Sequence, residues 1–244
     1  MLLTSADNPE IKNLRKLLAD SAARREQKSF VIEGFKIFQF ARQIQTIYAR
    51  EDIILPAQLR IHRHRYIAPT VFAGISEVEN PQGIMAVCRL PEPGQFSAAR
   101  KYIFLDRLQD PGNLGTIVRT AAALGWDGLI CNKGCADIFA PKAVRASMGA
   151  LFTLDILFAE IGEIAGLSGQ IIAADLQGVP PEDLRLDGGY VLAVGSEGQG
   201  LSPEVGQCAA QKVCLPFHKN KAESLNAAVA AGILLYELSR RGQG

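Results

Sequence analysis

The sequence predicts an α/β protein in which a small α/β domain precedes a larger domain built on a mostly parallel sheet. Two observations support this fold class. After residue 100, six short apolar segments alternate with helical or turn-like segments, a pattern typical of strands that helices cover on both sides. Before them, residues 90–99 are rich in proline and glycine and break the pattern, which indicates a linker. We therefore expect domains at residues 1–92 and 99–244.

The first expected element is an amphipathic helix near the amino terminus. Ile11, Leu14 and Leu17 recur at helical spacing in the segment NPEIKNLRKLLAD, so one face of this helix is apolar. Asp7 or Asn8 can cap its amino end. Short β-like segments then alternate with helical ones such as GFKIFQFARQ, and this alternation indicates a small α/β module.

Six strands are expected in the second domain. They correspond to the segments KYIFLD (101–106), DGLICN (127–132), LFTLDI (151–156), QIIAADL (170–176), YVLAVGS (190–196) and KVCLPF (212–217). In open parallel sheets, ligands bind beyond the carboxyl ends of the strands. Residues that directly follow these segments are therefore the candidates for a site.

Composition limits the class of protein. The 244 residues carry a net charge of +1 at pH 7, which alone neither favours nor excludes a nucleic-acid partner. The chain shows no apolar stretch long enough to span a membrane and no leader, so we expect a cytoplasmic protein. The five cysteines are scattered rather than clustered with the three histidines, which favours reduced thiols and no metal site. The first 92 residues hold slightly more basic than acidic side chains, the sign expected of an RNA binder.

The first candidate motif is DPGNLGTIVRTA, residues 110–121, where a strand gives way to a predicted helix. It lacks the glycine pattern of a dinucleotide-binding turn and the GK[ST] ending of a phosphate-binding loop. Helical geometry gathers Leu114, Ile117 and Val118 on one face, whereas Arg119 points away from it. Most such arginines are solvated, so the pattern alone leaves a solvated and a functional role open.

The second candidate motif is GSEGQGLS, residues 195–202, at the end of another predicted strand. Three glycines surround Glu197, which suggests a backbone that another group approaches closely. An ordinary turn between a strand and a helix is the alternative. Ser202 and Pro203 are typical of the first residues of the helix that follows.

The third candidate motif is LP…ESLN, which begins at Leu215 and ends at Asn226. Ser224 can cap a helix from Leu225 to Leu238 that is apolar nearly all round, and such a helix must be buried on all sides. Either a subunit interface or the core of one chain can bury it. The loop before it holds three side chains that either contact RNA phosphates or are solvated, namely His218, Lys219 and Lys221.

In this order and spacing, the three motifs resemble those of SpoU-type (TrmH-like) RNA ribose 2′-O-methyltransferases of the SPOUT superfamily. The resemblance covers about residues 101–241, and FAPKAVRASMGALF is similar to the family's ribosomal RNA branch. SADNPEIKNLRKLL and FVIEGFKIF are similar to the family's substrate-binding domain. The resemblance implies a deep trefoil knot in the C-terminal part of the sheet, a homodimer formed through it, S-adenosylmethionine as cofactor, and RNA, most consistently 23S or other ribosomal RNA, as substrate.

The resemblance also implies roles for individual residues. The catalytic candidates are Arg119, Asn113, Glu197 and Asn226. The residues expected to hold the cofactor, mainly through their backbone, are Gly195, Glu197, Gly198, Leu215, Ser224 and Leu225. Because a guanidinium group rarely gives up its proton, we expect Arg119 to grip a phosphate and aim the ribose hydroxyl, with Glu197 holding Arg119. Phe217, where many relatives carry methionine, is a departure that can alter cofactor affinity.

Other functions stay open on the sequence alone. A dehydrogenase-like Rossmann protein is weakened by the missing glycine fingerprint. A transfer RNA methyltransferase, or a non-catalytic RNA-binding or ribosome assembly protein that retains the fold, fits the same motifs. The RNA-contacting residues of the first domain are also open, and basic candidates are Lys12, Arg15, Lys16, Arg24, Arg25 and Lys28.

Overall fold

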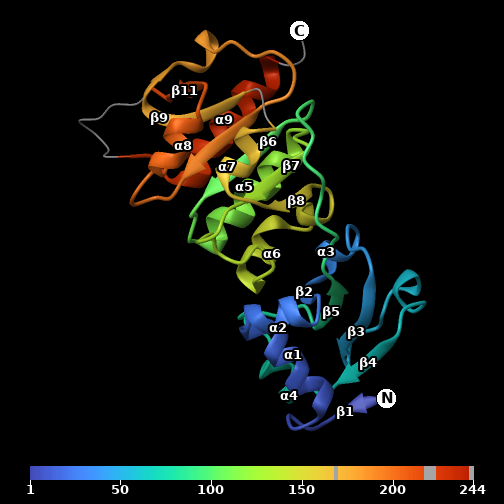
Figure 1. The fold of residues 1–244 in the computed structure, drawn as a ribbon. Coiled ribbons are helices and arrows are strands. Elements are labelled where there is room, and N and C mark those ends of the chain that lie inside the picture. The colour runs from blue at the N-terminus through green and yellow to red at the C-terminus, as the bar shows by residue number, and fades with distance from the viewer. Residues whose placement is uncertain (168–169, 217–223, 242–244) are drawn as a thin grey trace. The chain divides into compact units, whose positions relative to one another are not determined.

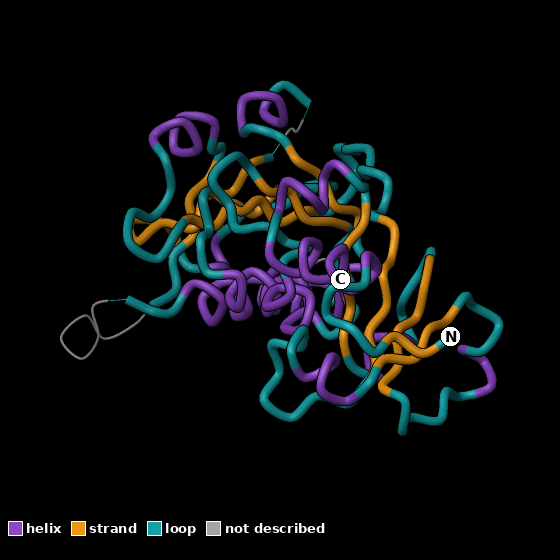
Figure 2. The backbone as a smooth tube through the Cα atoms, turned by 90° about the horizontal axis from the view of Figure 1, so that it is seen from below, coloured by secondary structure: helices purple, strands orange, loops and turns teal. Residues whose placement is uncertain are grey.

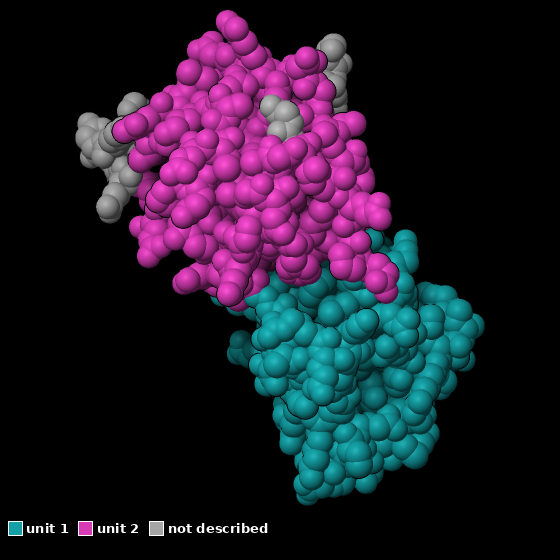
Figure 3. Space-filling view, in the orientation of Figure 1, with its two compact units in different colours: residues 1–91, 137–152 teal, residues 92–136, 153–244 magenta. Residues whose placement is uncertain are grey.

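The computed structural model describes residues 1–167, 170–216 and 224–241, which form two compact units. Unit 1 comprises Met1–Pro91 and Asp137–Phe152, and unit 2 comprises Glu92–Ala136 and Thr153–Gly244; Figure 3 shows each in its own colour. Each unit is built on one β-sheet (Figure 1). Within the described residues, no helix has the length and apolar character needed to cross a membrane.

Unit 1 contains a five-stranded mixed sheet in the order β1-β4-β3-β5-β2. Its strands are β1 (Leu2–Leu3), β2 (Ser29–Glu33), β3 (Ile44–Arg50), β4 (His64–Ile67) and β5 (Ile84–Arg89). β4 pairs in parallel with β1 and β3, whereas β5 is antiparallel to β2 and β3. The helices of its N-terminal part are α1 (Pro9–Ala19), α2 (Ser21–Glu26), α3 (Phe35–Phe38), the 3-10 turn η1 (Ala57–Leu59) and α4 (Pro69–Ala73).

Helix α1 confirms the amphipathic pattern of the N-terminal segment. Ile11, Leu14 and Leu17 are buried in the core of unit 1, and α1 packs on β2. The cap is Asn8, whose side-chain oxygen accepts a hydrogen bond from the backbone N–H of Glu10 at 2.8 Å. An asparagine there satisfies one of the orphan N–H groups at a helix start.

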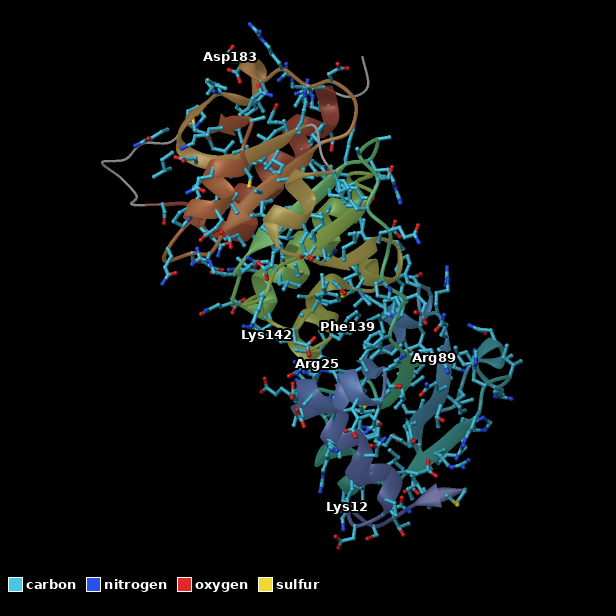
Figure 4. The ribbon with its side chains drawn as sticks, in the orientation of Figure 1. Lys12, Arg25, Arg89, Phe139, Lys142 and Asp183 are labelled. Atoms are coloured by element: carbon cyan, nitrogen blue, oxygen red, sulfur yellow. The ribbon has the colours of Figure 1, made fainter. Side chains whose placement is uncertain are left out.

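A segment from the second half of the sequence completes unit 1. It contains α6 (Pro141–Ser147) and the 3-10 turn η2 (Ala150–Phe152). The ring of Phe139, labelled in Figure 4, lies with its centroid 5.1 Å from that of Phe30. No sequence pattern predicts this grouping, because the alternation of apolar and helical segments continues from 99 to 244 and does not reveal where a connecting segment packs.

The same segment explains why Arg24 is not an RNA-binding candidate. Arg24 is only 4% exposed, and its guanidinium binds the carboxylate of Asp137 with N···O distances of 2.8 Å. It also donates to the carbonyls of Leu17 and Leu18. A buried arginine with all these partners is structural, whereas Lys12, labelled on α1 in Figure 4, is exposed.

Unit 2 contains a six-stranded, wholly parallel sheet in the order β11-β9-β10-β6-β7-β8. The strands are β6 (Tyr102–Asp106), β7 (Gly128–Cys131), β8 (Asp155–Phe158), β9 (Ile171–Val179), β10 (Val191–Gly195) and β11 (Gln211–Val213). The predicted fold class and parallel sheet are thus confirmed. Two expected segments differ in their bounds. Residues 150–152 form η2, so the strand expected at 151–156 begins only at Asp155, and the strand expected at 212–217 ends at Val213.

Helices lie on both sides of this strand layer (Figure 2). They are α5 (Pro111–Ala123), α7 (Ile161–Ala165), α8 (Pro203–Cys208) and α9 (Ala227–Arg241), with the 3-10 turn η3 (Pro181–Asp183). α5 packs against α9, and α7 packs against α8. The indole N–H of Trp126 donates to Ser239 Oγ at 2.9 Å, and the hydroxyl of Tyr190 donates to the carbonyl of Leu238 at 3.2 Å. These bonds anchor α9 to the body of unit 2.

Helix α9 differs from the prediction in its burial. It was expected to be covered on all sides, but Val229, Ile233 and Tyr236 are 52%, 41% and 48% exposed. Their spacing of four and three residues places them on one stripe of the helix. The inner face of α9 is therefore core, and its apolar outer face is exposed among the described residues.

Candidate active site

A cavity of about 280 Å³ lies at the carboxyl ends of β9, β10 and β11. Five of the six predicted cofactor residues line it, namely Gly195, Glu197, Leu215, Ser224 and Leu225. The remaining wall comes from the second half of β9, including Asp175 and Leu176, and from the first turns of α9. The carboxyl edge of a parallel sheet is where such folds bind ligands.

The loop after β10 closes tightly on itself. Ser196 and Gly200 exchange two backbone hydrogen bonds of 3.2 and 3.0 Å, and Gly200 adopts a φ of +65°. A Cβ on Gly195 would lie 2.2 Å from the carbonyl carbon of Gly200. Glycine at 195 is thus required by the closure of the loop itself, a reason that the sequence did not reveal. Around Gly198, by contrast, a Cβ would meet open space.

The buried carboxylate of Asp106 anchors the end of this loop through a hydrogen bond from Ser202. Asp106 ends β6 and is fully buried. It accepts hydrogen bonds from the backbone N–H of Ser202 at 2.5 Å and from the side-chain amide of Asn132 at 2.8 Å, and a third from Arg107 at 3.2 Å. Burial would raise the pKa of Asp106, but these hydrogen bonds outweigh it and lower the pKa below its usual value.

Arg107 is a second support for the loop. Its guanidinium donates to the side-chain oxygen of Gln199 at 3.1 Å. Its φ of +55° is left-handed, a conformation that carries a cost for a residue other than glycine. The backbone N–H of Arg107 is held in this conformation by the side-chain oxygen of Asn132 at 2.8 Å. Asp106 and Arg107 together fix the loop that carries Glu197.

Three of the four catalytic candidates meet in one hydrogen-bonded chain. The side-chain amide of Asn113 donates to the Glu197 carboxylate at 2.5 Å, and its oxygen accepts from the amide of Asn226 at 3.2 Å. Asn113 is fixed on the first turn of α5, where its backbone N–H donates to the capping carboxylate of Asp110 at 2.8 Å. This chain links the three sequence motifs in space.

Asn226 also replaces Ser224 as the cap of the last helix. Its side-chain oxygen accepts from the backbone N–H groups of Ala228 and Val229 at 2.9 and 3.2 Å. Because its oxygen caps α9, its amide group is left to point toward Asn113. The helix start thereby sets which end of this side chain faces the site.

Arg119 lies apart from this chain. It is exposed on α5, as the helical pattern predicted, and in the described part of the protein it lines neither the cavity nor the hollow beside α9. The contact described for Glu197 is with Asn113, in place of the expected contact with Arg119. Phe217, His218, Lys219 and Lys221, on which the sequence placed further expectations, lie outside the described residues.

Sequence reasoning missed the supporting residues Asp106, Arg107 and Gln199, and the lining residue Asp175. Asp106 and Asp175 were both visible as acidic residues at the ends of expected strands, so the strand-end rule would have indicated them. Arg107 and Gln199 carry no such signal, because their pairing depends on how two distant loops meet.

Comparison with known proteins agrees with this geometry. Residues 100–236 match the SpoU rRNA Methylase family, and residues 8–86 match the MRM3-like substrate binding domain. The chain is 32% identical to the 23S rRNA (guanosine(2553)-2'-O)-methyltransferase RlmP of Bacillus subtilis (strain 168), over 97% of this chain and 98% of that protein.

Solved structures show the same likeness. An AdoMet-bound rRNA methyltransferase from Sinorhizobium meliloti superposes with a TM-score of 0.87 at 29% identity, covering 99% of this chain and 98% of that one. The SpoU methyltransferase AviRb from Streptomyces viridochromogenes, in complex with AdoMet, gives a TM-score of 0.86 at 28% identity, covering 97% and 99%. The chain therefore belongs to the SpoU rRNA methylase family.

Proposed function

We propose that this protein transfers a methyl group from S-adenosylmethionine to a ribose 2′-hydroxyl of ribosomal RNA. The observation that carries the proposal is the chain Glu197–Asn113–Asn226, which joins the three family motifs beside a cavity at the carboxyl edge of the sheet. The names of the relatives, which include a 23S rRNA 2′-O-methyltransferase, support ribosomal RNA as the substrate.

The cavity suits S-adenosylmethionine. Its volume of about 280 Å³ is close to the lower end of the range for small-ligand sites, about 300 Å³. Leu215 and Leu225 supply apolar walls for an adenine ring, and the carboxylates of Asp175 and Glu197 on the lining complement a positively charged sulfonium. When bound, the cofactor supplies an electrophilic methyl group.

Side chains of the protein itself position the acceptor hydroxyl. Glu197 and Asn226 hold the Asn113 amide from both sides, so it is oriented before substrate arrives, and a preoriented group lowers the entropy cost of the reaction. The planar guanidinium of Arg119 binds the adjacent phosphate through two parallel hydrogen bonds. The proton of the ribose hydroxyl passes to that phosphate or to water. Gly195, Leu215, Ser224 and Leu225, which line the cavity, hold the cofactor. Gly198 contributes only through the backbone of the same loop.

The proposal includes a homodimer formed through α9. The exposed stripe of Val229, Ile233 and Tyr236 borders a hollow of about 490 Å³ that Asn113 and Asn226 also line. Covering this apolar stripe with a second copy removes it from water and encloses two catalytic candidates. Light scattering at micromolar concentration tests this, and a species of 26.3 kDa would contradict it.

The trefoil knot and the roles of the domains belong to the same proposal. The family membership given above implies a threaded C-terminal segment, and the sheet order, with β10 between β6 and β9, is compatible with it. Residues 1–92 serve as the RNA-binding domain and residues 99–244 as the methyltransferase domain.

The decisive experiment combines methyl-labelled S-adenosylmethionine with unmodified ribosomal and transfer RNA transcripts. A 2′-O-methyl group blocks alkaline cleavage of the RNA backbone, so label and resistance must coincide at one nucleotide. Label at a ribosomal position supports the proposal, whereas label only on transfer RNA changes the substrate. Cofactor binding without transfer to transcripts or ribosomal subunits would indicate a binding protein.

A further inference from the structure

Unit 1 contains a pocket of about 250 Å³ that the proposed methyl transfer does not use. It is formed by the end of β2, by α3, by the loop before β5 and by α6. Three apolar side chains, Ile37, Val78 and Met148, are among the residues that line it. Lys36 and Asn80, also on the lining, are exposed at its edge. The pocket therefore has apolar walls and a polar, basic rim.

Two charged residues of this pocket have atoms that lack hydrogen-bond partners among the described residues. Glu33 accepts a hydrogen bond from the hydroxyl of Ser76 on one oxygen, but its Oε2 is shielded from solvent and lacks a partner among the described residues. Arg145 donates from Nη2 to Glu77 at 3.3 Å, but its Nη1 is likewise shielded and unpaired within the described part of the chain. Folded proteins rarely leave such a donor and acceptor unmatched.

The backbone around these side chains is fixed before any ligand arrives. The side-chain oxygen of Gln82 accepts from the backbone N–H of Phe35 at 2.7 Å, which holds the corner between β2 and α3. Gly34 in that corner has a φ of +93°, and Met148, which is also on the lining and caps the end of α6, has a φ of +52°. Helices commonly end in a left-handed residue, and this one fixes the direction in which the chain leaves α6 beside the pocket.

We propose that this pocket binds a guanine base of single-stranded RNA, an inference that rests on the proposed action of the protein on RNA. Guanine presents two neighbouring N–H donors, which the Glu33 carboxylate accepts, and the acceptors O6 and N7, which the Arg145 guanidinium matches. The apolar side chains flank the flat ring, as in other sites that read an unstacked base. Lys36 at the rim lies where a backbone phosphate follows.

The electrostatics of Glu33 agree with this assignment. Burial raises the pKa of Glu33, and the Ser76 hydroxyl and Arg145 only partly offset that effect. Its carboxylate is therefore under-solvated in the free protein. The N–H groups of guanine restore hydrogen bonds to it, whereas adenine offers one donor beside an unprotonated ring nitrogen.

The test uses the full chain labelled with ¹³C-methyl methionine. The sequence holds three methionines, of which Met148 lines the pocket and Met85 is buried in the core of unit 1. We expect a nine-residue oligouridylate with one central guanosine to shift the Met148 methyl resonance and leave Met85 unmoved. Oligomers with adenosine or inosine in place of the central guanosine should bind about tenfold more weakly than the guanosine oligomer. Inosine differs from guanosine in lacking the exocyclic amine.

Glu33→Gln removes one acceptor and should erase the preference for guanosine, while Glu79→Gln, an exposed neighbour outside the lining, should keep it. Equal affinity for the guanosine and adenosine oligomers, or an unmoved Met148 resonance, would overturn the proposal even if the Glu33 variant failed to fold. Methyl transfer by the wild-type chain is measured in parallel. Transfer without guanosine preference defeats this inference alone, and guanosine preference without transfer defeats only the proposed function.

Discussion

Each unit holds a carboxylate with at least one oxygen shielded from solvent. The two carboxylates differ in how completely the protein donates hydrogen bonds to their oxygens. In unit 2, both oxygens of Asp106 accept hydrogen bonds from the protein. In unit 1, Glu33 is bonded through one oxygen, and the other has no partner among the described residues. A fully paired buried group fixes neighbouring backbone, whereas a partly paired one is able to bind an incoming molecule. This difference is the reason why we assign Asp106 a supporting role and propose a binding role for Glu33.

The pKa values of Asp106 and Glu33 are shifted in opposite directions. In each case the balance between burial and hydrogen bonding sets the direction. Hydrogen bonds to Asp106 outweigh its burial and lower its pKa, while burial of Glu33 outweighs its few partners and raises its pKa. Their contributions to stability should therefore respond to acid with opposite signs.

The largest effect is expected for Arg119→Ala. Loss of the phosphate clamp should slow methyl transfer by about a hundredfold or more, with cofactor affinity nearly unchanged because Arg119 lies outside the cavity lining among the described residues. Single-turnover transfer and calorimetric cofactor titration measure the two quantities. Arg185→Ala, on an exposed residue far along the chain, is the control. A residual rate within about tenfold of wild type, ~1.4 kcal/mol, would remove Arg119 from the chemistry.

A smaller but distinct effect is expected in the loop after β10. Gly195→Ala places a methyl group 2.2 Å from the backbone of Gly200, so the loop must open, at a cost of about 1–3 kcal/mol in stability and about tenfold in cofactor affinity. Gly198→Ala meets open space and should change cofactor affinity less than twofold. Calorimetric titration of both variants decides the matter. Equal losses at 195 and 198 would show that ligand contact, and not loop closure, requires the glycines.

Asp106→Asn tests the paired carboxylate directly. The variant loses an acceptor for the Ser202 N–H or the Asn132 amide, and hydrogen bonds to a charged group are worth about 1.5–3 kcal/mol. Because the pKa of Asp106 is lowered in the folded state, its contribution is present above the ordinary value of 3.8 and is lost as pH falls through the folded pKa. Urea unfolding at pH 7 and pH 3 should show the gap between wild type and variant narrowing in acid. A gap independent of pH would contradict this account.

The sequence predicted the parts of the molecule that depend on local pattern. The strands of unit 2, the capped helix α1 and the exposed position of Arg119 all follow from periodicity and capping chemistry, which act within one turn or one strand. The meeting of Asn113, Glu197 and Asn226 followed only from the family resemblance, because residues from three distant motifs share no local signal.

Other features lay beyond the reach of pattern. The packing of Phe139 onto Phe30 brings a late segment into unit 1, and no periodicity encodes such a contact between distant residues. The exposure of the apolar stripe on α9 could not be predicted, because the sequence does not distinguish an apolar residue of the core from one that a second chain covers. The loop-closing role of Gly195 appeared only when the backbone of Gly200 was in place.

The smallest expected effect sharpens the contrast between the two carboxylates. Glu33→Gln removes a charge that burial disfavours, and solvent reaches part of this residue, so the stability of unit 1 at pH 7 should stay within about 0.5 kcal/mol of wild type or rise slightly. A raised folded pKa means that the stabilising contribution of Glu33 is present below its ordinary value of 4.5 and is lost as pH rises through the folded pKa. Wild type should therefore gain on the variant in acid, opposite to Asp106. Hydrogen exchange of β2 and β5 at pH 7 and pH 4 measures unit 1 alone, and a variant that opens β2 far more readily at pH 7 would show that Glu33 is already satisfied by the protein and has no need of a ligand.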